Sequence, residues 1–211
     1  RILVKASTLI HQTQGVVLNH VKYAETSVIV HVYTEMFGRQ SYMMNNVRSA
    51  KNKGRSIFLQ PLALLELQVY HSPKKQVQRI KDFKIAKAFS SIPFDQTKRS
   101  VAFFVTEVLN RSLREEEANP EMFDFIFDAV QQLDEPIDNA HLFHLSFTAQ
   151  LTRFLGFYPH FSIDEPYAFD LRHGETVSDP PIHNHLIGRD LLPYWTELFE
   201  GNHHDLAKLP S

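Results

Sequence analysis

The spacing of apolar residues changes near residue 90, and this change constrains the fold more than any single motif. Before it, apolar residues come in short runs between turn residues, as in residues 27–33, where Val28, Val30 and Val32 share one face. Five such runs are predicted to be strands, at residues 14–21, 27–33, 40–44, 62–70 and 76–85. Five short strands close together indicate a small closed or partly closed barrel.

After residue 90, apolar residues recur three and four positions apart, which is typical of amphipathic helices. We predict helices at residues 95–114, 121–132, 139–155 and 189–200. Asn119 and Asp138 are predicted to cap the second and third helices, and Gly156 to end the third. Between the last two helices, residues 157–187 are predicted to be a loop-rich insertion with a hairpin at residues 167–177.

The chain is therefore predicted to be an α+β protein with two domains. A five-stranded barrel would occupy residues 1–86 and a mainly α-helical domain residues 87–211, with the boundary close to residues 86–93.

The distribution of charged residues changes near the same boundary. Residues 1–90 carry fourteen Lys and Arg against four Asp and Glu, whereas residues 91–211 carry eight against twenty. The basic half predicts a polyanionic partner, and the alternative is two ordinary solvated surfaces that differ in charge.

Composition excludes several classes of function. The chain has no Cys, which removes disulfides, thiol nucleophiles, iron–sulfur clusters and cysteine-based zinc sites. No apolar run approaches the ~18–20 residues that span a bilayer, and no signal peptide is recognised, so we expect a soluble, cytoplasmic protein. Motifs of serine hydrolases, phosphate-binding loops and dinucleotide sites are absent. We expect no enzyme activity and no cofactor.

Cations suited to phosphate contacts gather in the loops and on the last strand of the predicted barrel. Long flexible cations suit phosphates because this contact needs charge and reach more than fixed geometry. The predicted DNA-binding residues are Lys22, Tyr23, Arg39, Arg48, Lys51, Lys53, Arg55, Lys74, Lys75, Arg79 and Lys81. The aromatic residues available for base stacking are Tyr23, Tyr33, Phe37 and Tyr42. The alternatives are that a lysine on a turn is only solvated and that an aromatic ring belongs to the core.

Histidines gather in the C-terminal part of the chain. His160, His173, His183 and His185 lie there with several Asp residues, and His203 and His204 follow. Neutral imidazoles can bind zinc, but no spacing matches a known ligand pattern such as HExxH. We therefore expect surface or structural histidines and no metal. The alternative is a His/Asp metallo-hydrolase built from residues 160–205.

The ordered motifs resemble the RecO family of bacterial recombination mediators. In the first half these are the GVVL run at residues 15–18, Tyr23 with Glu25 and Ser27, Thr34 with Gly38, the basic loop 48–55 and the LQP at residues 59–61. In the second half, residues 112–134 and 143–161 are similar to two helical segments of the family. The resemblance covers roughly residues 8–161.

The resemblance implies an N-terminal OB-fold, a helical C-terminal domain and no catalytic turnover. Members of the family bind single- and double-stranded DNA, anneal complementary strands, and act with RecR and with the acidic, apolar C-terminal tail of single-strand-binding protein. They help to load RecA, so a nucleoid-associated protein of the bacterial cytoplasm is expected. The basic half of the chain coincides with the DNA-binding barrel that the resemblance implies.

An acidic, apolar tail requires a cation beside an apolar groove. The helical half offers few cations, and the predicted partner-binding residues are Arg111, Arg114, Arg153 and Phe154. The alternative for Arg153 is a surface residue whose stem covers the core. A rival hypothesis for the whole chain is a protein-interaction module that works through its acidic helical half, with the barrel as a scaffold.

The sequence departs from the family after Pro159. Many relatives carry a four-cysteine zinc ribbon there, and this chain has no Cys, so zinc is not expected. The hairpin at residues 167–177 is expected to fill that space with apolar packing. Residues 1–7 lie upstream of the usual start and are expected to be a leader, and a C-terminal piece beyond Ser211 is expected to be missing.

Overall fold

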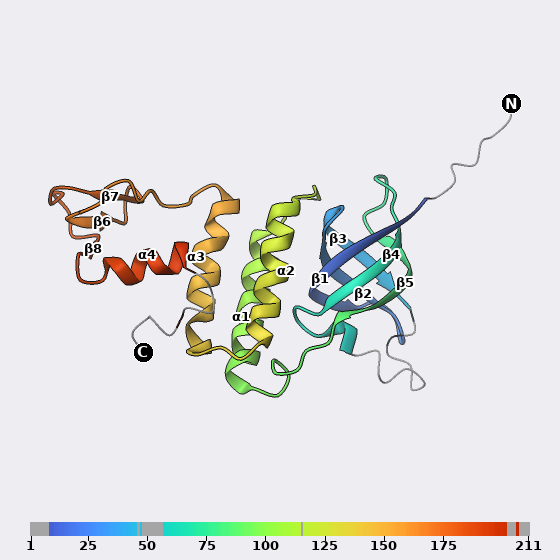
Figure 1. The fold of residues 1–211 in the computed structure, drawn as a ribbon. Helices are drawn as coiled ribbons and strands as arrows, with labels where there is room; N and C mark the ends of the chain where they lie inside the picture. The colour runs from blue at the N-terminus through green and yellow to red at the C-terminus, as the bar shows by residue number, and fades with distance from the viewer. Residues whose placement is uncertain (1–8, 46, 48–56, 115, 202–205, 207–211) are drawn as a thin grey trace, which may run out of the picture. The chain divides into compact units, whose positions relative to one another are not determined.

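The computed structural model describes residues 9–45, 47, 57–114, 116–201 and 206. Its first half is a closed five-stranded barrel in the order β1-β2-β3-β5-β4 (Figure 1). The strands are β1 (Ile10–Lys22), β2 (Val28–Thr34), β3 (Gly38–Met44), β4 (Leu64–Tyr70) and β5 (Gln78–Lys87). β3 and β5 pair in parallel and the other neighbours pair antiparallel. This confirms the predicted five-stranded OB-fold barrel.

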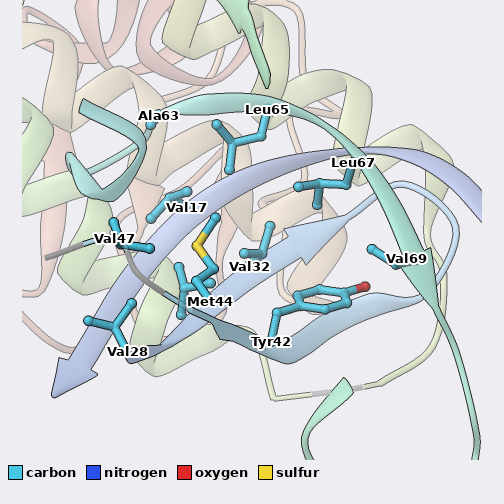
Figure 2. Close-up of a cluster of buried hydrophobic side chains, with 11 residues drawn as sticks. Val17, Val28, Val32, Tyr42, Met44, Val47, Ala63, Leu65, Leu67 and Val69 are labelled. Atoms are coloured by element: carbon cyan, nitrogen blue, oxygen red, sulfur yellow. The ribbon is translucent and has the colours of Figure 1, made fainter. Parts of the chain in front are cut away.

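The barrel interior is aliphatic. Alternate residues of β2 and β3 are buried, as their period-2 pattern predicts. Figure 2 shows this cluster of side chains from several strands, which consists of Val17, Val28, Val30, Val32, Tyr42, Met44, Val47, Ala63, Leu65, Leu67 and Val69. The core therefore fixes the register, because a shift by one residue would expose the whole set.

Two strands carry extra residues that bend them. In β1 the pairing with β2 skips Leu18, and in β5 the pairing with β4 skips Lys81 and Ala86. A bulge leaves its extra residue unpaired and sharpens the local twist, which helps a short sheet to close. β1 is also longer than predicted, because residues 10–13 pair with β4 although their sequence, IHQT, has little apolar character.

The helices follow the predicted order. They are α1 (Gln96–Ser112), α2 (Pro120–Asp134), the 3-10 turn η2 (Ala140–Leu142), α3 (Phe143–Leu155) and α4 (Leu192–Glu200). Asn119 caps α2 as predicted, since its Oδ1 accepts the Met122 N–H at 3.0 Å. Gly156 ends α3 with a φ of 81°. The prediction that Asp138 caps α3 is wrong, because η2 intervenes and the N-cap of α3 is Leu142.

The described residues form two compact units, one from residues 1–90 and 102–130 and the other from residues 91–101 and 131–211. The division passes through α1 and α2. Within the first unit, these helices lie on the outer surface of the barrel. The rings of Tyr33 and Phe123 are 6.3 Å apart, and Asn19 donates to Asn110 Oδ1 at 3.0 Å. The GVVL run explains this cover, since Val16 and Leu18 are buried on the side opposite Val17.

The second unit contains a small sheet. Its strands are β6 (Ala168–Asp170), β7 (Glu175–Val177) and β8 (Leu186–Gly188), in the order β7-β6-β8 (Figure 1). β6 and β7 form the predicted hairpin, and Gly174 supplies the positive φ that its turn requires. The hairpin packs through Phe169, whose ring lies 5.7 Å from Trp195 and 5.4 Å from Phe161.

Candidate nucleic-acid interface

The strand register places separate basic segments on either side of one face of the barrel. Lys22, the last residue of β1, lies opposite Val28 in β2, which in turn lies opposite Met44 in β3. The neighbouring residue Met43 lies opposite Arg79 at the start of β5. Lys22, before the β1–β2 turn, and Arg79, after the β4–β5 turn, therefore lie on either side of the β2–β3 face. The two turns lie at opposite ends of β1, because the β4–β5 turn follows Tyr70, which pairs with Ile10. OB-folds hold oligonucleotides with the loops that make these two connections.

A hollow of about 240 Å³ lies beside the β4–β5 turn and is lined by Tyr70, Ser72, Lys75, Gln78 and Arg79. Gln78 fixes its shape. The side chain of this buried residue accepts the Ser72 N–H at 2.9 Å and donates to the carbonyls of Ser72 at 2.9 Å and Lys75 at 2.8 Å. The Gln78 side chain thus holds the β4–β5 turn in a fixed conformation. Lys75 and Arg79 therefore border a hollow that is already formed.

A larger hollow of about 410 Å³ lies across β1, β4 and β5 but has the opposite charge. Its lining includes Glu35, Glu66, Asp82 and Lys84, and the Lys84 ammonium is already paired with Glu66 at 2.9 Å. A phosphate would meet three carboxylates there. The described lining of the smaller hollow has two cations and no carboxylate. Charge therefore favours the smaller hollow for a polyanion, although the other is larger.

The remaining cations of the prediction stay predictions. Lys22, Lys74 and Lys81 are exposed, and the bulge in β5 gives Lys81 a position outside the regular pairing. Tyr23 is 63% exposed beside Lys22 and presents a ring to solvent. Arg48, Lys51, Lys53 and Arg55 lie outside the described residues.

Two of the predicted stacking residues are wrong. Tyr33 and Tyr42 are buried, at 1% and 0% exposure, so neither ring can receive a base. Tyr42 belongs to the barrel core, where burial raises the pKa of its phenol. Phe37 is half-buried, and one face of its ring stacks on His71 with the centroids 4.1 Å apart. Aromatic residues are common in strands, where they pack in a core as readily as they face solvent. The sequence therefore allowed either place for these rings.

Arg39 holds an internal position that its sequence did not reveal. Its Nη1 donates to the carbonyls of Asn110 and Leu113, both at 2.6 Å, and its Nη2 donates to Asn110 Oδ1 at 2.8 Å. It therefore caps the carbonyl end of α1, where a cation is favourable. Burial, and then the charge of Arg114, lowers the pKa of Arg39. The prediction that Arg39 contacts DNA stays untested, but three acceptors already occupy its guanidinium.

The predicted partner-binding residues fall in both compact units. Arg111 is exposed and pairs with Glu107 at 2.6 Å, and Arg114 is exposed. Arg153 lies over the Tyr158 ring, with its Cζ 4.9 Å from the ring centroid, while Phe154 is half-buried. Arg153 thus has an aromatic neighbour, as a recognition site for an acidic, apolar peptide would need, but its role stays a prediction.

The histidine-rich segment contains a cluster that the sequence analysis missed. Asp170 is buried, and its Oδ2 lies 2.8 Å from His173 Nδ1 and 3.2 Å from His183 Nε2. Burial opposes ionisation of Asp170, but bonds from the His173 ring and from the backbone N–H groups of Arg172 and His173, with the charge of His183, lower its pKa to about 2. The hydrogen bond to Asp170, and then its charge, raises the pKa of His173.

The sequence did not identify Asp170 as a partner of these histidines. Ten residues separate His173 from His183 along the chain, and the small sheet brings them together. The signal in the sequence was DLRHG at residues 170–174, an acid and a histidine three apart directly before the glycine of a hairpin turn. His160 and His185 are exposed and are not part of this cluster.

Together these features define a protein with an OB-fold barrel, basic segments on either side of its β2–β3 face and a helical C-terminal region. Two family models match, described as Recombination protein O N terminal over residues 9–89 and Recombination protein O C terminal over residues 93–164. The chain belongs to the RecO family of DNA repair and recombination proteins. The described residues contain no helix with the length and apolar character to cross a membrane.

Several curated relatives carry the name DNA repair protein RecO. The one from Bacteroides fragilis is 37% identical over 86% of this chain and 76% of its own length. That from Phocaeicola vulgatus is 35% identical over 83% and 73%, and that from Flavobacterium psychrophilum is 36% identical over 77% and 68%. The chain is similar to these proteins over both the barrel and the helical region.

Proposed function

We propose that this chain is a recombination mediator that binds single- and double-stranded DNA, anneals complementary strands and helps to load the recombinase. The observation that carries the proposal is the placement of Lys22 on one side of the β2–β3 face and of Lys75 and Arg79 on the other. Cations beside this face would neutralise phosphates and release counterions. Annealing follows from the same property, because neutralised strands repel each other less. No catalytic turnover is part of this function.

The position of the basic hollow supports a defined path for the DNA backbone. A phosphate between Lys75 and Arg79 would lie at the β4–β5 turn, and the exposed ring of Tyr23 at the β1–β2 turn could stack on a base. Stacking and phosphate contacts read no sequence, so binding without sequence preference is expected.

The test is binding to a fluorescent single-stranded oligonucleotide across a salt series. The wild-type chain should bind with a steep log–log salt slope. Lys75→Ala with Arg79→Ala should flatten that slope by up to about 1.4, since each lost phosphate contact removes about 0.7 for single strands. Lys84→Ala is the matched control, because Lys84 is an exposed cation on the same strand but is paired with Glu66. It should leave the slope unchanged.

Two other outcomes would revise the proposal. No binding by the wild-type chain at low salt would overturn it and would favour a protein-interaction module. A slope that is the same in wild type and in the Lys75/Arg79 variant would move the DNA away from this hollow. The basic loop with Arg48, Lys51, Lys53 and Arg55 would then be the next set to change.

We infer that RecR and the C-terminal tail of single-strand-binding protein are the protein partners, within the recombinase-loading pathway of the bacterial cytoplasm and nucleoid. For the tail, Arg153 supports the proposal, because it is exposed and lies over Tyr158 in the last turn of α3. A labelled acidic, apolar peptide should bind the wild-type chain. Arg153→Ala should weaken that binding, and Arg172→Ala, an exposed arginine of the same unit, should not.

A further inference from the structure

The small sheet β6–β8 gathers three potential metal ligands that the DNA-binding function does not use. Asp170 Oδ2, His173 Nδ1 and His183 Nε2 all lie within 4.8 Å of one another. Asp170 ends β6, His173 follows in the β6–β7 turn, and His183 precedes β8. The pairing of Asp170 with Leu186 in β8 holds the second segment beside the first. The segments that carry these ligands are therefore held by the hydrogen bonds of one sheet, β7-β6-β8, whose strands are labelled in Figure 1.

The carboxylate of Asp170 is fixed so that one oxygen faces the two imidazoles. Its Oδ1 accepts the backbone N–H groups of Arg172 at 2.8 Å and His173 at 3.3 Å. The Gly174 N–H closes the same turn on the Asp170 carbonyl at 2.8 Å. Oδ2 is then left for His173 and His183. The Asp170 side chain is 2% exposed, so this charge is a buried centre and not one of many surface acids.

The geometry fits a small tetrahedral ion. Zinc binds imidazole nitrogen and carboxylate oxygen at about 2.0–2.2 Å, which puts two tetrahedral ligand atoms about 3.4 Å apart. The observed separations are 2.8 Å for His173 and 3.2 Å for His183. They would need to widen by about 0.6 and 0.2 Å to reach the tetrahedral separation. His183 Nε2 is also buried and, although it lies 3.2 Å from Asp170 Oδ2, it forms no hydrogen bond among the described residues.

We propose that Asp170, His173 and His183 bind a divalent transition-metal ion, such as Zn²⁺, that fastens the β6–β7 hairpin to the segment before β8. Two imidazoles and one carboxylate suit zinc, cobalt, nickel and copper better than magnesium or calcium, which prefer oxygen ligands. Phe169 precedes Asp170 in β6, points to the opposite face of the strand and packs on Trp195, which anchors the strand that carries Asp170.

Binding requires a change at each imidazole. His183 Nδ1 accepts the His185 backbone N–H at 3.4 Å, and this weak contact must open so that Nδ1 carries the proton while Nε2 binds the ion. His173 must lose the Nδ1 proton that it donates to Asp170 Oδ2, but its ring already faces Asp170 and its side chain is 66% exposed. His183 is therefore the ligand whose orientation should respond most to the ion.

The test is a titration of the purified, EDTA-treated full chain with Zn²⁺ by calorimetry and with Co²⁺ by visible absorption. One Zn²⁺ per chain and the intense absorption of tetrahedral Co²⁺ are expected. His173→Gln and His183→Gln should each weaken binding by about tenfold or more. His160→Gln is the matched control, an exposed histidine of the same unit outside the cluster, and should bind as the wild-type chain does.

The histidine variants leave the bonds from Asp170 Oδ1 to the backbone in place, so they are expected to fold, and far-ultraviolet circular dichroism checks this. No binding to the wild-type chain would overturn the proposal and leave imidazole–carboxylate hydrogen bonds only. Equal binding by His173→Gln, His183→Gln and the wild-type chain would also overturn it, because the ion would then lie elsewhere on the chain. Neither result bears on DNA binding by the barrel.

Discussion

The two β-structures of this protein are held together in different ways. The barrel has five strands of seven to thirteen residues around an aliphatic core, and each strand pairs on both sides. The small sheet has three strands of three residues each, and its interior contacts centre on the aromatic ring of Phe169 and the carboxylate of Asp170.

This difference shows that the size of a sheet determines which interactions must stabilise it and fix its register. In the barrel, many small apolar contacts and long ladders specify the register, so no single side chain is indispensable. Three strands of three residues supply few ladder bonds and are marginal without further support. In the small sheet, Phe169 supplies the apolar packing and the adjacent residue Asp170 supplies the polar contacts. Single substitutions there should therefore destabilise this sheet and leave the barrel intact.

The largest expected effect is from Phe169→Ala. This residue is 2% exposed and contacts Phe161 and Trp195, so its removal should reduce the free energy of unfolding of the second unit by about 3–5 kcal/mol. Hydrogen exchange should show lost protection in β6–β8 with protection in β1–β5 retained. Phe157→Ala is the control, since Phe157 is 64% exposed. Equal loss of protection in the barrel strands would contradict the contrast between the two sheets.

The next largest effect is expected in the barrel unit, from loss of the hydrogen bonds that Arg39 donates to the end of α1. Arg39→Gln should reduce the free energy of unfolding by about 1.5–3 kcal/mol, because a charged donor with three acceptors at the end of α1 is lost. Arg79→Gln should leave stability nearly unchanged, since Arg79 is exposed. Urea denaturation of both variants measures this.

The same two variants separate the structural arginine from the DNA-binding one. In the salt series, Arg79→Gln should flatten the slope and Arg39→Gln should not. The reverse pattern would return Arg39 to the DNA interface and would show that the bonds to Asn110 and Leu113 are dispensable.

Close packing inside the barrel can be tested at Gly15. A Cβ at this position would lie 2.5 Å from Val32 Cγ1 and 3.1 Å from Leu67 Cδ1, so Gly15→Ala should destabilise the barrel by about 1–3 kcal/mol. Val32→Ala removes the closer obstacle. Gly15→Ala should therefore be less costly in the Val32→Ala background than alone, and a double-mutant cycle by thermal denaturation measures the difference. If the two changes in the free energy of unfolding were additive, a Cβ at position 15 would not clash with Val32.

Much of this architecture follows from local sequence patterns. The strands and helices could be predicted because β-branched runs and 3–4 spacing depend on nearby residues, and Gly38, Gly156 and Gly174 marked three of their ends through positive φ angles. The cover of α1 and α2 on the barrel was signalled only by the GVVL run, whose apolar side chains face both ways. The five strands were predicted from these runs, and the OB-fold from the family resemblance.

The parts that could not be predicted depend on contacts between distant residues. Arg39 and Asn110 are 71 positions apart, and nothing around either residue indicates the bond. His183 meets Asp170 and His173 only because β8 pairs beside β6. Asp138 gave a misleading cap signal because the chain makes a left-handed turn at Asn139 before the helix begins. In each case the tertiary structure, and not a local preference, decided the outcome.

The smallest expected effect is a pH dependence of the barrel, and it concerns His31. Its Nδ1 lies 2.9 Å from Ser41 Oγ, and burial, followed by the charge of Arg39, lowers the pKa of His31 below 6.5. The folded barrel then binds this proton less readily than the unfolded chain. Stability from this group is fully present above about pH 6.5 and is lost as the pH falls from 6.5 through the lowered folded pKa.

The imidazole shifts of His31 in an NMR titration would give the folded pKa directly. His31→Gln should remove part of the decline in the free energy of unfolding between neutral and mildly acidic pH, and the rest of that decline should remain. His20, an exposed histidine of β1, provides the matched control through His20→Gln. A His31 that titrates at or above its usual pKa would mean that the barrel wall near Ser41 is wetter than its packing indicates. The contrast between a dry, aliphatic barrel and a polar small sheet would then be weaker at this position.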